Sequence, residues 1–282
     1  MLVALVALVT GTSFARADTP RWKQLSPPPA MPAPVASGDL PVDDFTLHWA
    51  AYGDAKAPPV VLLHGGFGSA DDFAAQVPEL AKTFRVIAVD SRGHGRSTRS
   101  AHGVTYHLMA EDVIALLDHL KVDQAALVGW SDGGIVALDV AMHHPARVTR
   151  LAVTGTNYAR TGSKPAGKGT PFDAYYARCV AEYKRLAPDP KQLAAFRKDL
   201  RAMWKREPAY TDDEIRAITA PLLVLHGERD EIIEQDHVEH LVALVPDAKL
   251  VVLAGVSHFA MWQDPAAFNK VLLAFLRAPA RR

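Results

Sequence analysis

Short apolar runs alternate with longer amphipathic segments along the chain from residue 43 onward. The apolar runs, rich in Val, Leu and Ile, predict strands at residues 45–53, 58–65, 84–90, 124–130, 148–155, 221–227 and 248–255. Segments whose apolar residues recur every three or four positions predict helices at residues 71–83, 106–120, 133–144, 235–245 and 265–276. Near-continuous apolar strands are typical of parallel sheets covered on both faces. The alternation predicts an α/β fold with a doubly wound, mostly parallel sheet.

One segment, residues 157–220, interrupts this alternation. Its apolar spacing is helical at residues 172–186, 191–205 and 211–218, and it contains no strand-like run. The segment lies between two predicted strands, and ligands of open α/β sheets bind at the carboxyl ends of the strands. We therefore expect a helical cap over that edge, inserted into a core formed by residues 43–156 and 221–282.

The first 42 residues differ in composition from the rest. Residues 1–17 combine an apolar run, too short to cross a bilayer, with the sequence Ala-Arg-Ala at its end, as in a secretory signal peptide. No Lys or Arg precedes the run, which is atypical. We expect an exported protein, periplasmic or secreted, with a cytoplasmic location as the alternative. Residues 18–42 are rich in proline and are predicted to form an extended leader outside the core.

The charge balance narrows the range of partners. Of 282 residues, 31 are Lys or Arg and 31 are Asp or Glu, so the formal net charge is zero. A nucleic-acid-binding protein needs a basic surface, which this composition does not predict. Stable membrane insertion is not expected either. Cys179 is the only cysteine, so we expect a buried thiol and no internal disulfide.

A serine stands where a predicted strand meets a predicted helix. Gly129, Trp130, Ser131, Asp132 and Gly133 form the pattern Gly-x-Ser-x-Gly. Glycines on both sides allow a tight turn in which the strand and the helix pass close together. The serine hydroxyl then lies at the positive end of the helix, where an oxyanion is favoured. This context predicts that Ser131 is a nucleophile.

A serine nucleophile needs a histidine base and a carboxylate that orients the base. His258 follows the last predicted strand, and Asp230 follows the strand before it, so both are expected at the same edge of the sheet as Ser131. Glu228 and Glu231 are rival acids because they flank Asp230. The chain order Ser131, Asp230, His258 is the order found in α/β hydrolases.

Five motifs together carry a resemblance to a known family. They occur in the order LLHGGFGS, VDSRGHGRS, GWSDGG, LHGERD and GVSHF. With these motifs the chain resembles the α/β hydrolase fold family over nearly all of residues 43–276. The resemblance implies a serine hydrolase that cleaves carboxylic esters of small molecules through an acyl-enzyme intermediate.

The resemblance also implies roles for neighbouring groups. The backbone N–H groups of Gly66 and Asp132 would form the oxyanion hole, with the N–H of Phe67 as the alternative donor. His64 would hydrogen-bond its own loop rather than act as a base. The polar side chains of residues 90–97 would fix a turn that supports the nucleophile.

Asp132 has two possible roles, and they imply different substrates. The helix dipole alone favours an acid in the first turn of a helix. The motif GWSDGG is also similar to that of valacyclovir hydrolase, in which the corresponding acid recognises the α-amino group of an amino-acid ester. An amino-acid ester or amide hydrolase, or a peptidase, is therefore an alternative function. A receptor of hydrolase fold with slow turnover is another, and non-hydrolytic use of the triad occurs in similar proteins.

Candidates for the substrate pocket are mostly aromatic. They comprise Phe67, Trp130, Tyr158, Trp204, Phe259 and Met261, together with the acid Asp132. Such a mixture predicts a partly apolar pocket that binds a small ester or amide.

Metal and cofactor sites have little support in the sequence. His237 and His240 lie on one helical face, but no third ligand is indicated. Other histidines in helical patterns, among them His107 and His143, are expected on the surface or in packing. The glycine-rich nucleotide-binding patterns and the zinc-protease pattern HExxH do not occur. We therefore predict neither a metal nor a cofactor.

Overall fold

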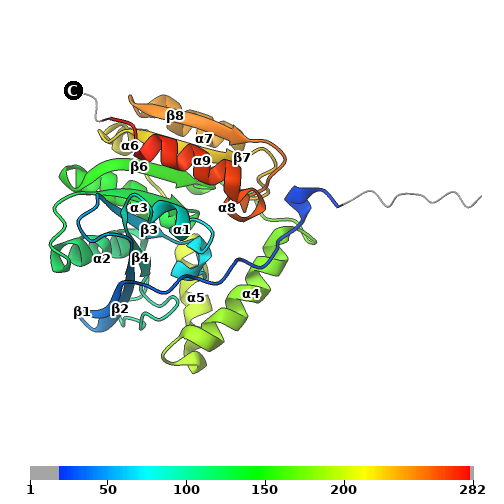
Figure 1. Cartoon of the computed structure of the whole chain (residues 1–282). Coiled ribbons are helices and arrows are strands. Elements are labelled where there is room, and N and C mark those ends of the chain that lie inside the picture. The colour runs from blue at the N-terminus through cyan, green and yellow to red at the C-terminus, as the bar shows by residue number, and fades with distance from the viewer. Residues whose placement is uncertain (1–18, 280–282) are drawn as a thin grey trace, which may run out of the picture.

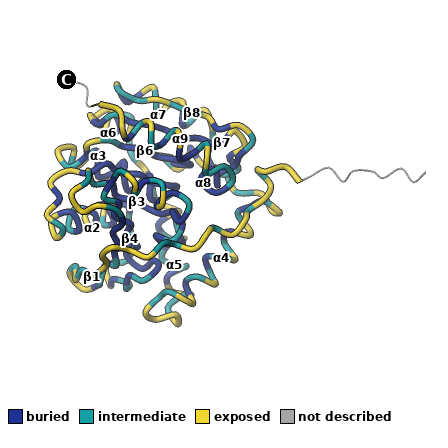
Figure 2. The backbone as a smooth tube through the Cα atoms, in the orientation of Figure 1, coloured by how far each residue is buried: buried dark blue, intermediate teal, exposed yellow. Residues whose placement is uncertain are grey.

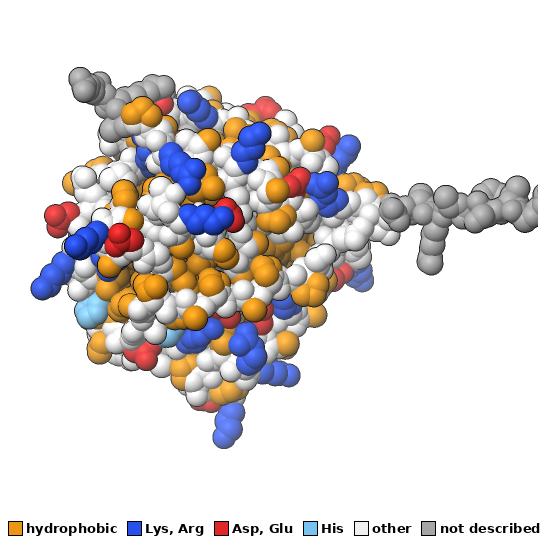
Figure 3. Space-filling view, in the orientation of Figure 1, with side chains coloured by type: hydrophobic (Ala, Val, Ile, Leu, Met, Phe, Trp, Pro, Cys, Tyr) orange, Lys and Arg blue, Asp and Glu red, His pale blue; other side chains and the backbone are white. Residues whose placement is uncertain are grey.

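The structure, a computed structural model, describes residues 19–279. The predicted signal peptide, residues 1–17, lies outside the described residues. Among the described helices, none is both long enough and apolar enough to cross a membrane. On the face drawn in Figure 3, acidic and basic side chains are interspersed, and no stripe of one sign is present.

A single sheet forms the centre of the molecule (Figure 1). In the described part of the chain its eight strands lie in the order β1-β2-β4-β3-β5-β6-β7-β8. Only the pairs β1–β2 and β2–β4 are antiparallel, and all other neighbours run parallel. The strands span Ala36–Val42, Phe45–Tyr52, Pro59–Leu63, Arg85–Asp90, Ala125–Trp130, Val148–Thr154, Leu222–Gly227 and Ala248–Leu253, numbered β1 to β8 in chain order. The predicted mostly parallel α/β sheet is confirmed.

Helices cover the sheet and join its parallel strands. Helix α3 packs against β3, β5 and β6, whereas α7 packs against β7 and β8. The helices α1 to α9 span Val77–Leu80, Tyr106–His119, Asp132–His143, Pro171–Leu186, Leu193–Trp204, Asp212–Arg216, Gln235–Leu244, Ala260–Gln263 and Pro265–Leu276. Short 3-10 turns occur at Arg21–Lys23, Ala70–Phe73, Pro145–Arg147, Arg160–Gly162 and Pro190–Gln192.

The core lies on both faces of the central strands. Every residue of β5 and of β7 is buried, and so are the last four residues of β3. In Figure 2 the buried backbone, drawn in dark blue, lies in the interior of the molecule. Burial on both faces explains why the sequence of each strand is almost continuously apolar rather than alternating.

The sheet begins earlier than the sequence predicts. Residues 36–42, assigned above to a leader outside the core, form β1 and pair along their whole length with β2. The strand is at the edge of the sheet, and four of its seven residues are exposed. An edge strand tolerates Gly38 and Pro41 because only one of its sides needs hydrogen bonds. The apolar pattern therefore misses it, and the core starts at residue 36 rather than 43.

Between β6 and β7 the chain folds into α4, α5 and α6, where the sequence predicts a helical cap of residues 157–220. Helices α4 and α5 lie side by side and extend away from the sheet (Figure 1). The Tyr175 hydroxyl of α4 donates a hydrogen bond to the Gly66 carbonyl oxygen at 3.1 Å. Arg178 of α4 pairs with the buried Asp72 at 3.0 Å. These bonds attach the cap to the loop that follows β3.

Two glycines allow α3 to start directly above the sheet. A Cβ atom on Gly129 would lie 2.3 Å from the Gly133 carbonyl oxygen. A Cβ atom on Gly133 would lie 2.0 Å from the carbonyl oxygen of Leu63, in the neighbouring strand β3. Both distances are far below van der Waals contact, and both obstacles are backbone atoms. Only glycine permits this approach of the helix to β3 and β5.

We predict that Gly133→Ala lowers the free energy of unfolding by about 2 kcal/mol or more, because the added methyl group forces backbone apart in a packed core. Urea unfolding of the purified variant measures the change. Gly167→Ala is the matched control, since its Cβ would meet only Thr170 Cγ2 at 3.7 Å, and its effect should stay within about 0.5 kcal/mol. Equal stabilities of the two variants would contradict the steric argument.

Candidate active site

Ser131 lies in the turn between β5 and α3, with a backbone conformation that residues other than glycine rarely adopt. Its φ is 52° and its ψ is −121°. Its N–H donates to the Thr154 carbonyl oxygen at 2.9 Å, and its own carbonyl oxygen accepts from the N–H of Gly134 at 2.9 Å. Strained backbone of this kind is found at functional sites, where surrounding structure holds it in place. The turn presents the partly exposed Ser131 at the wall of a cavity.

His258 and Asp230 meet at the carboxyl ends of β8 and β7. Nδ1 of His258 lies 3.2 Å from Oδ1 and 3.1 Å from Oδ2 of Asp230, and both side chains are buried. Oδ1 of Asp230 also accepts hydrogen bonds from the backbone N–H groups of Ile232 and Ile233, each at 2.8 Å. The carboxylate is therefore held by two backbone N–H groups as well as by the imidazole.

The structure distinguishes Asp230 from the two neighbouring glutamates. Glu228 is exposed, and its carboxylate accepts the backbone N–H of Gly255. Glu231 accepts the backbone N–H of His258 at 3.1 Å rather than bonding to the imidazole ring. Of the three acids, only Asp230 orients the ring.

Burial and charge act in opposite directions on this pair. Burial alone would lower the pKa of His258, but the Asp230 carboxylate and its hydrogen bond outweigh burial and raise that pKa above its ordinary value. Burial alone would raise the pKa of Asp230, but His258 holds it below its ordinary value. The carboxylate thus stabilises a protonated imidazole, as a general base requires after it has taken a proton.

Ser131 and His258 line the same cavity, which has a volume of about 450 Å³. Core residues on its wall include Gly66, Trp130, Asp132 and Ile233. The segment between β6 and β7 supplies much of the remaining wall, with Arg160, Ser163, Lys164, Phe172, Tyr175, Trp204 and Glu207. The volume suits a small molecule.

Several predicted pocket residues do not reach this cavity, which corrects the sequence analysis. Phe67 is buried against Tyr176 and Phe196 of the cap. Phe259 is fully buried and stacks on Trp262. Tyr158 and Met261 are likewise buried and absent from the cavity wall. An aromatic residue near a motif can pack inward as readily as outward, and periodicity does not distinguish the two in a loop.

Other residues of the cavity wall were not indicated by the sequence. Tyr106 begins α2, whereas Tyr175 and Glu207 belong to the segment between β6 and β7. Glu207 accepts a hydrogen bond from the backbone N–H of Tyr106 at 3.0 Å. No motif marks these residues, because they come together only through the packing of the cap on α2.

Gly66 and Asp132, which line the cavity with Ser131, have backbone N–H groups available to a ligand, whereas Phe67 lies outside the cavity wall. Within residues 19–279, the N–H groups of Gly66, Phe67 and Asp132 donate to no protein acceptor. Asp132 is the first residue of α3, so its N–H lies at the positive end of the helix dipole. Free donors at such a position suit an oxyanion.

The Asp132 carboxylate links the core to the cap. Oδ1 accepts the Tyr106 hydroxyl at 3.0 Å, and Oδ2 accepts Nε1 of Trp204 at 2.7 Å. Burial raises the pKa of Asp132 to about 6, although both hydrogen bonds oppose that shift. The acid is therefore more than a helix-end residue, since it also holds α2 and α5 together beside Ser131.

His64 and Asp90, expected to have structural roles, form hydrogen bonds away from the cavity. Nε2 of His64 accepts the backbone N–H of Ser91 at 3.0 Å, and its Nδ1 donates to the Gly65 carbonyl oxygen. The Asp90 carboxylate accepts the backbone N–H groups of Ala70 and Arg96. The structural role expected of these residues agrees with these bonds.

Comparison with known proteins places the chain in a family. A family model described as "alpha/beta hydrolase fold" matches residues 58–171. A non-heme haloperoxidase from Rhodococcus erythropolis is 32% identical over 270 residues, which cover 84% of this chain and 97% of that protein. The chain belongs to the α/β hydrolase fold family.

Several proteins similar to this chain are named as hydrolases. Serine hydrolase BPHL of Mus musculus is 27% identical, with 86% of this chain and 87% of that protein covered. The crystal structure of carboxylesterase CesB from Bacillus subtilis has a TM-score of 0.70 at 25% identity, with 86% of this chain and 93% of that chain covered. The α/β hydrolase described here is accordingly an enzyme of the hydrolase class.

The raised pKa of Asp132 predicts a pH dependence of stability. Its folded-state pKa of about 6 exceeds the ordinary value of 3.8, so the folded protein binds the proton more tightly than the unfolded chain does. Protonation therefore stabilises the fold, and this contribution is lost as the pH rises from about 4 to about 6.

Asp132→Asn removes this titration. We expect the difference in unfolding free energy, wild type minus variant, to decrease as the pH rises from about 4 to about 7. Urea unfolding at several pH values measures this difference. Subtracting the two free energies cancels the titration of groups that do not interact with Asp132. A difference that stays constant with pH would contradict the shifted pKa.

Proposed function

We propose that this α/β hydrolase cleaves carboxylic esters of small molecules, with Ser131 as nucleophile, His258 as general base and acid, and Asp230 as the residue that orients His258. One observation carries the proposal: the strained Ser131 shares a cavity with a buried histidine whose Nδ1 is bonded to a buried carboxylate. The names of the similar carboxylesterase and serine hydrolase support the same class of reaction.

The reaction follows from the roles of these groups. His258 Nε2 removes the hydroxyl proton of Ser131 as Oγ attacks the ester carbonyl carbon, while Nδ1–H donates to Asp230. The oxyanion is stabilised by the N–H groups of Gly66 and Asp132, with that of Phe67 as the alternative to Gly66. His258 then protonates the departing alcohol, which leaves an acyl-Ser131. Water, activated by His258, attacks the acyl carbon and releases the acid and the free serine.

Multiple-turnover hydrolysis of p-nitrophenyl acyl esters tests this proposal. We expect the wild type to release many product molecules per enzyme and Ser131→Ala to release none above background. Asp230→Asn should lower kcat by roughly 10⁴-fold, because the imidazole then takes the wrong tautomer. Glu228→Gln is the matched control and should retain activity, since the Glu228 carboxylate bonds to the Gly255 N–H and Arg229 and not to His258.

Two results would contradict the proposal. If Asp230→Asn stays active while Glu231→Gln is inactive, Glu231 rather than Asp230 orients His258. A folded wild type that reacts once at Ser131 and releases no further product would favour a receptor of hydrolase fold over an esterase.

A specific observation favours a second candidate, an aminoacyl-ester hydrolase. The carboxylates of Asp132 and Glu207 both lie on the cavity wall, where they could receive an ammonium group. Each Asp132 oxygen accepts one hydrogen bond, which leaves lone pairs for a further donor. Neutral esters remain the primary proposal because Tyr106 and Trp204 already give this carboxylate a structural role.

Asp132→Asn separates the two candidates. If Asp132 binds an ammonium group, the variant should raise KM for an aminoacyl p-nitrophenyl ester by about 10-fold or more, since hydrogen bonds to charged groups contribute roughly 1.5–3 kcal/mol. The matched ester without the amino group should be nearly unaffected. Similar losses for both substrates would restrict Asp132 to holding the cap and the oxyanion donor in place.

A further inference from the structure

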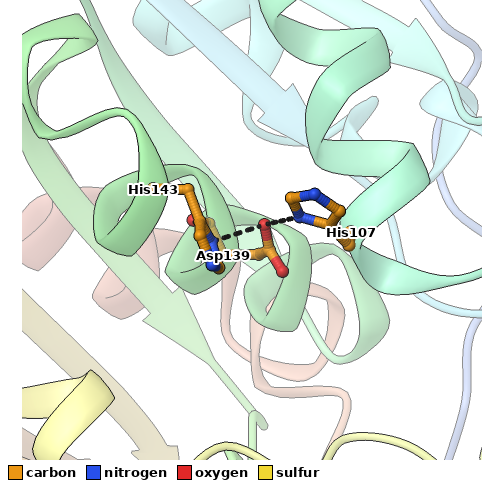
Figure 4. A group of neighbouring side chains, drawn as sticks. All are labelled: His107, Asp139 and His143. Carbon is orange, nitrogen blue, oxygen red and sulfur yellow. Dashed lines mark hydrogen bonds and ion pairs between the residues drawn. The ribbon is translucent and has the colours of Figure 1, made fainter.

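A cluster of two histidines and one aspartate lies where α2 crosses α3, away from the cavity. His107 comes from the first turn of α2, and Asp139 and His143 lie one turn apart on α3 (Figure 4). Nδ1 of His107 and Nδ1 of His143 lie 3.0 Å and 3.1 Å from the same atom, Oδ1 of Asp139. None of the three lines the cavity that contains Ser131.

The environment of the cluster is polar on one side and buried on the other. The Asp139 side chain is 1% exposed, whereas the His107 and His143 side chains are 55% and 42% exposed. Oδ2 of Asp139 accepts the hydroxyl of Tyr210 at 2.7 Å. The carboxylate is thus held rigidly from inside, and both imidazoles close over it from the solvent side.

The spacing of the three atoms suits a metal ion. All three ligand atoms lie within 4.8 Å of one another. Zinc binds imidazole nitrogen and carboxylate oxygen at about 2.0–2.2 Å, so two ligands of one tetrahedral ion lie roughly 3.4 Å apart. Small rotations of the two half-exposed rings, which pack edge-to-face on each other, would open the observed distances to that value.

The groups beside the cluster determine which tautomers its histidines can adopt. Without a metal, each imidazole can donate its Nδ1–H to Asp139, and Nδ1 of His143 also lies 3.0 Å from the Asp139 backbone carbonyl oxygen. A metal would displace these bonds and require the tautomer with the proton on Nε2. Nε2 of His107 lies 3.9 Å from Oε1 of Glu111, beyond hydrogen-bond distance, and that oxygen is bonded to Nε2 of His144 at 2.7 Å. A rotation of the His107 ring toward Glu111 would form the bond that a metal-binding tautomer needs. Metal-bound histidines commonly donate their second nitrogen to a carboxylate. Tyr210 would fix the bound Asp139 in the same way.

We propose that Nδ1 of His107, Nδ1 of His143 and Oδ1 of Asp139 bind one Zn²⁺ ion, with water as the fourth ligand. Mixed nitrogen and oxygen donors favour zinc over Mg²⁺ or Ca²⁺, which prefer oxygen ligands alone. The ion would join α2 to α3 and, through Tyr210, to the segment between α5 and α6. The site is separate from the proposed triad and takes no part in ester cleavage.

Calorimetric titration of the chelator-treated full-length protein with Zn²⁺ tests the proposal. We expect one ion per chain, and at least about 100-fold weaker binding for His107→Ala and for His143→Ala. Tyr210→Phe should weaken binding by about 10-fold, as the loss of a group that orients a ligand usually does. Zn²⁺ should also raise the thermal midpoint of the wild type but not that of the His107→Ala/His143→Ala double variant, since only the folded chain holds the ligands together.

His119→Ala is the matched control, because this exposed histidine lies at the other end of α2; it should bind Zn²⁺ as the wild type does. The histidine variants replace half-exposed side chains, and circular dichroism verifies that they fold. Absence of saturable Zn²⁺ binding by the wild type would overturn the proposal. So would unchanged binding by the folded double variant, which would place the ion elsewhere, for example at His237 and His240.

Discussion

The conformation of Ser131 is the constraint on which the rest of the structure depends. Holding a non-glycine residue at a φ of 52° costs on the order of 1–3 kcal/mol. The turn cannot relax, because α3 is pressed against the backbone of β3 through Gly133 and against β5 through Gly129. The parallel pairing of β5 with β3 and β6 fixes those strands in turn. The hydroxyl group is thus positioned by backbone packing rather than by side-chain contacts.

Much of the fold and the proposed triad could be predicted from sequence, because both depend on local order. Central strands are apolar throughout since both faces are buried, and Ser131 and Asp230 lie in the loops that follow two such strands, β5 and β7. His258 lies in the loop after β8, an edge strand that is only partly buried but equally rich in Val and Leu. Parallel strands bring their carboxyl ends to one edge, so position along the chain was enough to bring these residues together. The choice of Asp230 over its neighbours needed the structure, since adjacent loop residues differ only in direction.

The remaining features depend on packing between distant segments. The position of Phe67 beneath the cap and the contact of Trp204 with Asp132 are set by how α4 and α5 lie on the core. The same holds for His107 of α2, whose ring meets Asp139 and His143 of α3. Spacing within one helix predicts none of these contacts. The metal site is therefore a hypothesis that the structure raises and the sequence argued against.

The irregular sequence of β1 has a consequence for association between molecules. An open edge of a sheet can pair with the edge of another chain, and long, flat, apolar edge strands do so readily. In the described part of the molecule β1 ends the sheet, and it carries Gly38, Asp39 and Pro41 within seven residues. A proline without an N–H, a charge and a flexible glycine make this edge a poor template for intermolecular pairing. The glycine, acid and proline that interrupt the apolar pattern of β1 thus also protect the enzyme against aggregation through that edge.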